Sequence, residues 1–442
     1  MGAGGRKRMS VIAQELLEAV VNRLPEDSLT PVRQAALAEF AKTGFPTTRN
    51  EDWKYTNLAA VVELSNAYLA NASAFVPHAE WTGAAKRVVD EILESIDASW
   101  IIVANGIIAL ETLAKAESLE SQGIHISKLS NGRANLAIIS DDPMTSFNAA
   151  LLLDGLQVGI RSGAYDAKPL GFLFFDDAQN GGLSQTRLII DVEADANIDI
   201  IEAHVSIGSD AQFANTVIQL NIDDRAQVGY VRIQDRADTH MQIGKLITAL
   251  QRDAVFDYAS FDFGGSLIRN DVAIDIAQPG ATAILNGLYL AGGRQHIDNH
   301  TRVDHRVGPA VSREEYRGIL SGRARCVFNG KAIVHKGADG TDAEQSNHNL
   351  LLSKTSEIDT KPELEIYADD VKCAHGATVG QLDKSALFYL RTRGLDQDEA
   401  AQLLTRAFAA RILTAAPIEA THAYIGQRTE QRLDELISGD TP

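Results

Sequence analysis

Two side chains with the chemistry of iron ligands, Cys373 and His375, lie two residues apart near the end of the sequence. On a β-strand this spacing places both side chains on one face, with about 6.7 Å between their Cα atoms. A thiolate and an imidazole at that separation can reach the same small metal centre, and both suit iron. The alternative is a half-buried cysteine beside a hydrogen-bonded histidine, with no ligand role.

The number of cysteines limits what this pair can hold. The chain has 2 cysteines, Cys326 and Cys373, and neither belongs to a Cys-x-x-Cys motif. An iron–sulfur cluster usually takes about four protein ligands, mostly thiolates, so a cluster at Cys373 and His375 would have to be shared with another chain. So few cysteines also argue against a disulfide-built secreted protein, and they make the cytosol the default compartment.

A second group of candidate ligands consists of His296, His300 and His305, which fall within one run of ten residues. Three imidazoles in a short run could bind zinc. Their spacings of four and five residues, however, place at least one pair on opposite faces of a strand. We therefore expect these histidines to form hydrogen bonds in turns rather than a metal site.

Motifs of enzymatic catalysis are weaker. Ser312, Ser321 and Ser346 lie near histidines, but no Gly-x-Ser-x-Gly, Walker A or Gly-x-Gly-x-x-Gly motif occurs. The adjacent carboxylates Asp369 and Asp370 would suit a glycosidase or lyase, yet neighbours on a strand point to opposite faces. A β-helix enzyme, either a polysaccharide lyase or a metal-dependent hydrolase, is the enzymatic alternative.

The composition of the chain restricts its class. Its 442 residues are 45% hydrophobic and 23% charged, as in globular proteins, and they suffice for about three domains. A net charge of −18 disfavours nucleic-acid binding. No apolar run approaches the roughly 18 residues of a membrane helix. No apolar core like that of a signal peptide follows the basic residues within 1–10, so we expect a cytoplasmic protein.

The elements that must position these side chains fall into four regions. Residues 1–95 are helical in pattern, with one helix expected over 11–24 and another from an N-cap at Thr30 to Gly44. Residues 96–180 alternate helical stretches with short apolar runs, which is typical of an α/β segment leading into the core. The apolar runs lie at 100–103, 136–139 and 170–175.

Residues 181–383 contain short strands with Gly, Asp and Asn between them. Three segments share one spacing, in which a small residue is followed by apolar residues two, four and seven positions later. They begin at Ala226, Ala254 and Ala281, and a segment at Ala324 matches the first part of the pattern. Steps of 28 and 27 residues suit a solenoid in which each coil buries its apolar face against the next. We therefore expect a β-helix core in this region.

Residues 384–442 return to a helical pattern. A first helix from Lys384 is expected to end at Gly394, and Asp396 with Glu399 has the spacing of a capping box at the start of the next. A last amphipathic helix follows over 418–437. The expected apolar stripe of the middle helix consists of Ala400, Leu403, Leu404, Ala407, Phe408 and Ile412.

Several long motifs resemble the SufB/SufD family of iron–sulfur cluster assembly proteins. They cover most of the chain: Arg49–Asn57, Asp304–Leu320, Gly322–Lys331, Thr341–Asn347, Leu350–Ser353, Lys361–Gly380 and Phe388–Gly394. SufB-like chains carry a cysteine close to the position of Gln345–His348, where this chain has none. The resemblance is therefore to the SufD-type members of the family.

The resemblance implies a right-handed parallel β-helix core, flanked by N-terminal helical and C-terminal helical domains. It implies a non-catalytic scaffold subunit that pairs with a SufB-like subunit and binds a SufC-like ABC-type ATPase through residues 384–442. A homodimer is a further expectation for the chain when it is alone. No stably bound cofactor is expected in the isolated chain, only a transient iron–sulfur cluster in the complex.

The resemblance also implies roles for the two candidate ligands. In SufD-type chains the histidine that matches His375 lies at the interface with the SufB-like subunit, where the nascent cluster forms. His375 is thus expected to hold metal transiently, in a site shared with the partner chain. Cys373 is its neighbour in the same motif and is expected to lie at the same interface.

Overall fold

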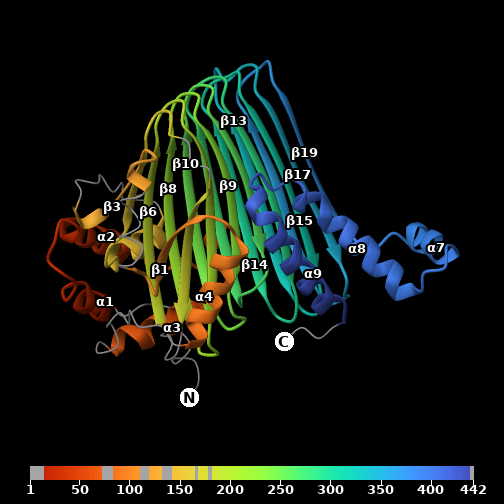
Figure 1. Ribbon diagram of the computed structural model, residues 1–442, viewed down its shortest axis with the longest axis horizontal. Helices are drawn as coiled ribbons and strands as arrows, with labels where there is room; N and C mark the ends of the chain where they lie inside the picture. The colour runs from red at the N-terminus through yellow and green to blue at the C-terminus, as the bar shows by residue number, and fades with distance from the viewer. Residues whose placement is uncertain are drawn as a thin grey trace.

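Two long and mostly parallel β-sheets form a β-solenoid at the centre of the chain (Figure 1). The computed structural model describes residues 14–71, 83–109, 119–131, 142–164, 168–177 and 182–438. The strands are β1 (Ser99–Ala104), β2 (Ile107–Ile108), β3 (Ile124–Lys128), β4 (Leu156–Ile160), β5 (Leu170–Asp177), β6 (Gly182–Val192), β7 (Asn197–Ile207), β8 (Gln212–Ile222), β9 (Gln227–Asp235), β10 (Met241–Leu250), β11 (Val255–Asp262), β12 (Leu267–Ile276), β13 (Thr282–Ala291), β14 (His296–His305), β15 (Val311–Leu320), β16 (Arg325–Val334), β17 (Asp342–Leu351), β18 (Glu357–Ile366) and β19 (Lys372–Gly380).

Consecutive strands alternate between the two sheets from β4 onward. Sheet A has the order β19-β17-β15-β13-β11-β9-β7-β5-β1-β2, and sheet B has the order β18-β16-β14-β12-β10-β8-β6-β4-β3. Each coil therefore contributes one strand to each sheet and stacks in parallel on the coil before it. This arrangement confirms the parallel β-helix that the repeat spacing predicts.

A ladder of buried alanines explains that spacing. Ala226, Ala254 and Ala281 are 0% exposed, and each directly precedes a strand of sheet A. The carbonyl of each alanine accepts a hydrogen bond of 2.9–3.0 Å from the first strand residue of the next coil. From β7 onward, the strands of sheet A start at Asn197, Gln227, Val255, Thr282, Val311, Asp342 and Lys372, which gives coils of 27 to 31 residues.

The match at Ala324 has a different origin. This alanine precedes β16, a strand of sheet B, and its carbonyl accepts a hydrogen bond from the Glu357 amide. The segment at Ala324 thus has the first part of the pattern but belongs to sheet B. Ala324 is 0% exposed, so a buried alanine precedes a strand in sheet B as well as in sheet A.

The apolar residues of each repeated segment face two different cores. Residues two and four after the alanine, such as Val228 and Tyr230, lie in the core inside the solenoid. The residue seven positions after the alanine, such as Ile233 or Phe261, points outward because the offset is odd. It lies in a second core, beneath the helices that cover sheet A.

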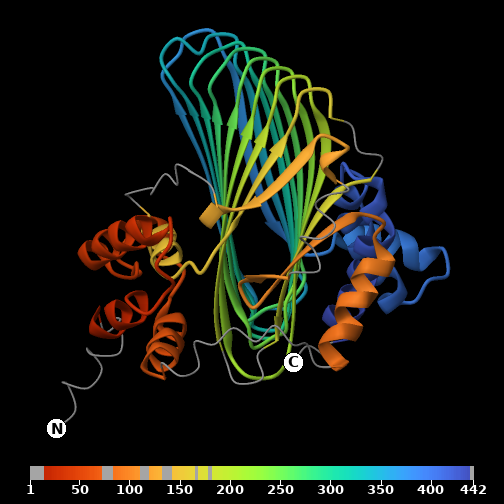
Figure 2. The same cartoon turned by 60° about the vertical axis from the view of Figure 1, so that its left-hand side comes forward.

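The N-terminal helices lie on one side of the solenoid, against the outer face of sheet B (Figure 2). Their apolar residues share a core with Leu183, Phe213 and Met241 of that sheet. The elements of this layer are α1 (Gln14–Val21), α2 (Thr30–Thr43), η1 (Glu51–Trp53), α3 (Ala59–Ala70), η3 (Leu129–Asn131) and α6 (Pro143–Ala150).

Two expectations about these helices need adjustment. The helix expected over 11–24 is α1, and residues 11–13 lie outside the described part of the chain. Helix α2 ends at Gly44, as expected, but Thr30 is its first residue and Leu29 is the N-cap. The Thr30 hydroxyl instead accepts a hydrogen bond of 3.0 Å from the Asp27 amide.

The opposite side of the solenoid, the outer face of sheet A, carries α4 and the C-terminal helices (Figure 2). These are α4 (Gly83–Ser95), α7 (Lys384–Thr392), α8 (Gln397–Leu413), η4 (Glu419–Thr421) and α9 (His422–Ser438). The capping box of Asp396 and Glu399 is present at the start of α8. No described helix is long and apolar enough to cross a membrane.

The apolar stripe expected on α8 is only partly correct. Ala400 and Ile412 are buried, but Leu403 is 47% exposed. Ala409 lies in the core with sheet A instead. The first part of α8 extends away from the sheet toward α7 (Figure 1), so apolar residues there have no sheet to cover.

The two ends of the solenoid differ. At the first end, β2 pairs with β1 and β3 pairs with β4, both antiparallel, so these short strands close the stack. The runs expected at 100–103 and 170–175 are β1 and β5, whereas the run at 136–139 lies outside the described residues. At the other end, β18 and β19 are the last strands of their sheets.

Candidate functional site

Cys373 and His375 both lie on β19, the last strand of sheet A. In the parallel register they follow Ala343 and Gln345 of β17, which continue the inward-facing rows of the solenoid. The two side chains therefore belong to the inner face of the final coil, as their spacing predicts. Because no further coil is stacked on β19, this inner face is open.

Exposed apolar residues mark the same open end. Ile366 on β18 and Val379 on β19 occupy inward-facing register positions, yet they are 43% and 49% exposed. In earlier coils the equivalent positions are covered by the next coil. The end of the solenoid thus has the composition of a core that lacks its last layer.

The two cysteines are in different environments. Cys326 on β16 is 1% exposed inside the solenoid, whereas Cys373 is half-buried. Burial raises the pKa of the Cys373 thiol and raises that of Cys326 far more. Reactivity follows thiolate content and access, so Cys326 is a structural residue and Cys373 is the one available for chemistry.

This difference gives a direct prediction for thiol labelling. In the native chain at pH 8, we expect a disulfide reagent to modify one thiol, Cys373, within minutes. Cys326 should react only after denaturation. Cys373→Ser should abolish the native signal, whereas Cys326→Ser should leave it unchanged. Two equivalents of rapid labelling in the native protein would contradict this assignment.

His375 borders an open depression on the outer side of sheet A, at its edge. The depression is lined by Glu315, Arg317, Gln345, His348, His375 and Arg411. Glu315 binds Arg317 at 2.8 Å on the same strand and Arg411 of α8 at 3.2 Å. Helix α8 is therefore attached by an ion pair at the rim of the depression that contains His375.

The three histidines of β14 do not form a metal site. The expectation that they lie in turns is wrong, because β14 spans His296–His305. His296 and His300 face outward, where their Nε2 atoms contact the Thr56 hydroxyl at 2.8 Å and the Asp298 carboxylate at 2.9 Å. His305 faces inward, contacts the Ser312 hydroxyl at 2.9 Å, and has its pKa lowered to about 4 by burial.

The N-terminal motif Arg49–Asn57 docks on the outer face of sheet B through this same strand. The Arg269 guanidinium lies 3.9 Å from the centre of the Trp53 ring. It also donates to the Asp52 carbonyl at 2.7 Å and to the Asp298 carboxylate at 2.8 Å. The motif thus has a structural role that links the N-terminal layer to the solenoid.

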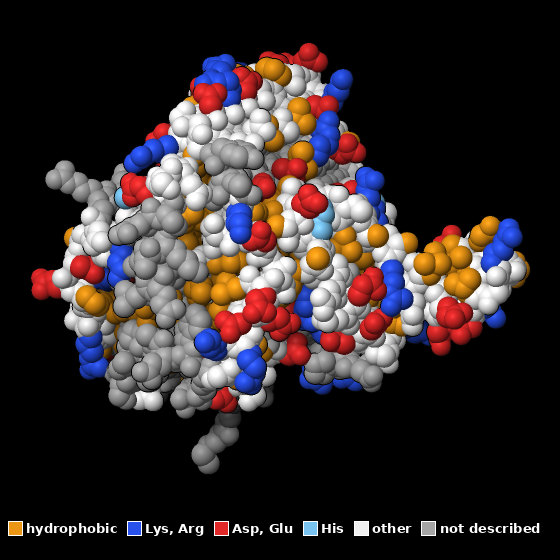
Figure 3. Space-filling view, viewed as in Figure 1, with side chains coloured by type: hydrophobic (Ala, Val, Ile, Leu, Met, Phe, Trp, Pro, Cys, Tyr) orange, Lys and Arg blue, Asp and Glu red, His pale blue; other side chains and the backbone are white. Residues whose placement is uncertain are grey.

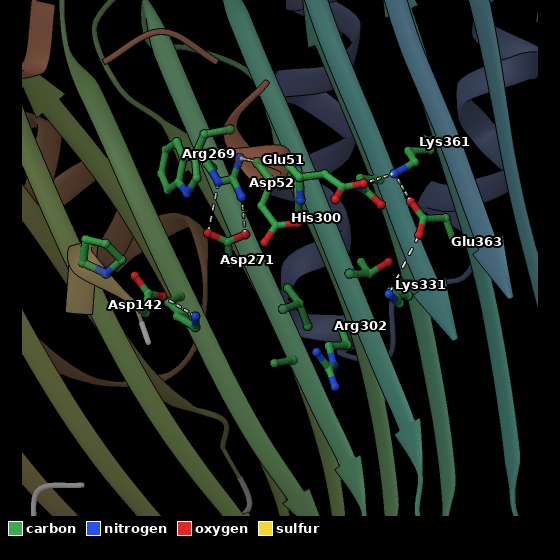
Figure 4. Close-up of a pocket in the computed structure, with 17 residues that line it drawn as sticks. Glu51, Asp52, Asp142, Arg269, Asp271, His300, Arg302, Lys331, Lys361 and Glu363 are labelled. Atoms are coloured by element: carbon green, nitrogen blue, oxygen red, sulfur yellow. Dashed lines mark hydrogen bonds and ion pairs between the residues drawn. The ribbon is translucent and has the colours of Figure 1, made fainter. Parts of the chain in front are cut away.

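A hollow lies beside this contact (Figure 4). Lys361 pairs with Glu51 at 3.2 Å and also contacts Glu363, and Lys331 pairs with Glu365 at 2.5 Å. Each of these carboxylates is ion-paired with a lysine of β16 or β18, which is typical of a structural ion-pair network rather than of a general acid–base pair.

The other carboxylate pair has no enzymatic geometry either. Asp369 and Asp370 are exposed in the bend between β18 and β19, not on a strand. The Asp370 carbonyl accepts a hydrogen bond from the Gly340 amide, and the Asp369 amide donates to the Asp339 carboxylate at 3.3 Å. These contacts connect two successive turns of the solenoid.

The donor set at the open end is incomplete by itself. Among the described residues, no group of three or more His, Cys, Asp or Glu side chains could hold a metal ion. Cys373 and His375 therefore supply at most two ligands, fewer than a cluster usually requires. They are suited to supply part of the ligand set of a site that a second chain completes.

Two further residues near the open end escaped the sequence reasoning. Glu314 of β15 and Gln345 of β17 are buried inside the solenoid, where the Gln345 amide donates to the Glu314 carboxylate at 2.6 Å. The sequence could have revealed them, because Glu314 lies two residues from Ser312 and Tyr316, and Gln345 lies two residues from Asn347. Residues two apart on a strand face the same side, and here that side is the inside of the solenoid.

Comparisons with known proteins agree with this architecture. Residues 15–170 match the SufBD protein N-terminal region, and residues 174–408 match the SufBD core domain of SUF system FeS cluster assembly. The chain is 30% identical over 410 residues to the iron–sulfur cluster assembly protein SufD of Escherichia coli, covering 91% of this chain and 93% of that protein. It is 26% identical over 427 residues to a SufBD family protein of Synechocystis, covering 93% and 92%.

Proposed function

Because this chain belongs to the SufBD family of iron–sulfur cluster assembly proteins, we propose that it is a non-catalytic scaffold subunit of the SUF machinery. In this role it pairs with a SufB-like subunit and binds a SufC-like ABC-type ATPase. The observation that carries the proposal is the uncovered last coil, which presents His375 and Cys373 beside exposed apolar side chains.

The partner subunit completes this last coil. A second chain that covers β18 and β19 would bury Ile366 and Val379 and supply the ligands that His375 and Cys373 lack. The His375 imidazole then binds iron, and the Cys373 thiolate can share it. Both belong to a transient site, with the nascent cluster as cargo. The same open edge accounts for a homodimer when the chain is alone.

The ATPase binds at the projecting helix α7. None of the residues of α7 is buried, and Phe388 and Tyr389 are 69% and 57% exposed. Figure 3 shows hydrophobic side chains gathered on this arm of the molecule. From α7 the chain continues into α8, where Arg411 binds Glu315 at the rim of the His375 depression. A movement of these helices is thus mechanically connected to the cluster site.

Co-expression tests the proposed function. The chain is produced with a SufB-like subunit and a SufC-like ATPase, and the purified complex is analysed for subunit ratio, iron and sulfide. We expect the three chains to co-purify stably. We also expect the complex to contain iron and sulfide, in amounts up to stoichiometric with the complex. Failure to co-purify would reject the scaffold role, and turnover of a polysaccharide or ester by the isolated chain would favour the β-helix enzyme.

A prediction for the isolated chain follows from its incomplete donor set. Purified alone and treated anaerobically with iron and sulfide, it should retain little cluster after desalting, because it supplies at most two ligands. The measurement is visible absorption together with iron and sulfide content per chain. A long-lived, stoichiometric chromophore in the isolated chain would contradict a shared site.

A further inference from the structure

A buried carboxyl group lies beneath the open end of the solenoid. Glu314, Gln345 and His375 occupy consecutive strands of sheet A in one register row, on the inward-facing side. Neighbouring strands lie about 4.8 Å apart, so Glu314 is about 10 Å below His375. Gln345, between them, binds the Glu314 carboxylate at 2.6 Å and also lines the depression that contains His375.

A glycine and a small void lie beside the Glu314 carboxyl and its partner Gln345. A Cβ atom at Gly330 of β16 would lie 2.0 Å from the Gln345 Nε2 atom, so a larger residue at this position would displace the amide from its place beside Glu314. A void of about 10 Å³ remains beside Ser312, Glu314 and Gln345. Glu314 Oε1 and Gln345 Oε1 are buried without a hydrogen-bond partner. A void of this size, with two unpaired acceptors, has room for one water molecule.

No positive charge compensates Glu314. Among the described residues, no Lys, Arg or His forms an ion pair with it. The residues that face it from neighbouring strands are Leu285, Thr301, Val303, Ala332, Gln345 and Leu364. The titratable groups around it are Glu344, which lines the same void, the Tyr316 phenol, on the same strand, and the neutral His305, which contacts Ser312. Burial raises the pKa of Glu314 to about 7, against the opposing effect of its hydrogen bonds.

We propose that the Glu314 carboxylate is the buried counter-charge for a cation that binds at His375. The proposal rests on the proposed function, because the cation in question is the iron of a nascent cluster. Binding of Fe²⁺ at the open end favours the ionised form of Glu314, and the carboxyl proton is released to solvent. No electron is transferred, and the only bond broken is the O–H bond of the carboxyl.

The size of this linkage follows from charge and distance. A divalent cation and a carboxylate about 10 Å apart, in a protein of effective dielectric constant near 20, would change each other's binding by roughly 200-fold. Solvent at the exposed end of the solenoid screens this interaction, and we expect an effect of about tenfold. Linkage is reciprocal, so ionised Glu314 strengthens Fe²⁺ binding by the factor by which Fe²⁺ favours ionisation. Glu314 thus acts on the bound cation through its charge, without direct contact. Gln345, which lies between them, holds the Glu314 carboxylate by a hydrogen bond.

The test compares the wild type with Glu314→Gln, which keeps the shape and removes the charge. Fe²⁺ is titrated anaerobically into the purified complex at pH 6 and at pH 8. We expect the wild type to bind Fe²⁺ about tenfold more tightly than the variant at pH 8, and nearly equally at pH 6. Protons released on binding, measured in weak buffer, should fall in the variant. Glu365→Gln, which removes an exposed carboxylate on the outer face of the last coil, is the control.

The possible outcomes separate this inference from the proposed function. An affinity ratio that is the same at both pH values would mean that Glu314 acts through folding, and would overturn the linkage. Absence of Fe²⁺ binding to the wild-type complex would overturn both the linkage and the role of His375.

Two further measurements keep the inference testable if Glu314→Gln assembles poorly. Gln345→Met removes a hydrogen bond that lowers the pKa of Glu314, so the rise in affinity should move to higher pH. In the isolated chain, the folded state holds the extra proton between the ordinary glutamate pKa and about 7. Its free energy of unfolding should therefore fall as pH rises through this interval. If the free energies of unfolding of the wild type and of Glu314→Gln differed by the same amount at every pH, the proposal would be contradicted.

Discussion

His375→Ala should lower the iron and sulfide content of the assembled complex at least about tenfold, while all three subunits remain together. The imidazole is the stronger ligand candidate on β19, and the half-buried Cys373 thiol beside it has a raised pKa. Alanine can neither bind iron nor exchange a proton. The exposed position of His375 at the end of the stack means that its loss leaves no cavity in the core. The measurement is iron and sulfide per complex, after the subunit ratio has been checked.

His300→Ala is the matched control. It removes an imidazole from the outer face of sheet B, where His300 contacts Asp298 rather than the open end. We expect this variant to lose stability without losing cluster per assembled complex. Full cluster loading in the His375→Ala complex would instead show that the His375 imidazole is structural.

Replacing both Phe388 and Tyr389 with alanine should weaken binding of the ATPase more than about 100-fold. Aromatic anchors that become buried in an interface commonly contribute 2 kcal/mol or more each. Both side chains are largely exposed on α7, so their removal costs the folded chain little. The measurement is the affinity of the ATPase for the purified variant, with circular dichroism as the check on folding.

Tyr55→Ala serves as the control for this variant. Tyr55 is 43% exposed on the N-terminal side of the solenoid, away from α7. Its replacement should leave ATPase binding unchanged. Point variants are preferable to removal of residues 384–442, because α8 and α9 bury Ile412, Ile425 and Leu433 against sheet A. Truncation would expose that core, and it would confuse loss of docking with loss of folding.

The sequence predicts the solenoid well because its repeats obey simple geometry. The alanine positions are fixed by close packing where the chain enters sheet A, and the alternation of apolar residues is fixed by the period of the strand. Cys373 and His375 were placed on one face by the same period. None of these inferences needs knowledge of contacts between distant residues.

Other features depend on contacts that a single sequence does not reveal. β14 is polar on both faces, so its period of two is hidden and its histidines resembled turn residues. Arg313, Glu314 and Glu315 are adjacent and all ionisable, but only the register shows that Glu314 alone points into the solenoid. Helical periodicity places Leu403 on the apolar stripe, but it does not show that this part of the helix extends beyond the sheet, where Leu403 is exposed.

The difference between the two ends of the stack has a consequence for how the chain is made. Synthesis runs from the N-terminus, so the strands that close the first end leave the ribosome before the later coils. Each coil packs only against its neighbours, and β19 is the last strand of sheet A along the chain. His375 is thus synthesised after every earlier coil, and its strand pairs with β17. A chain that stops before β19 would lack the site altogether, so a subunit that presents His375 has a completely synthesised solenoid.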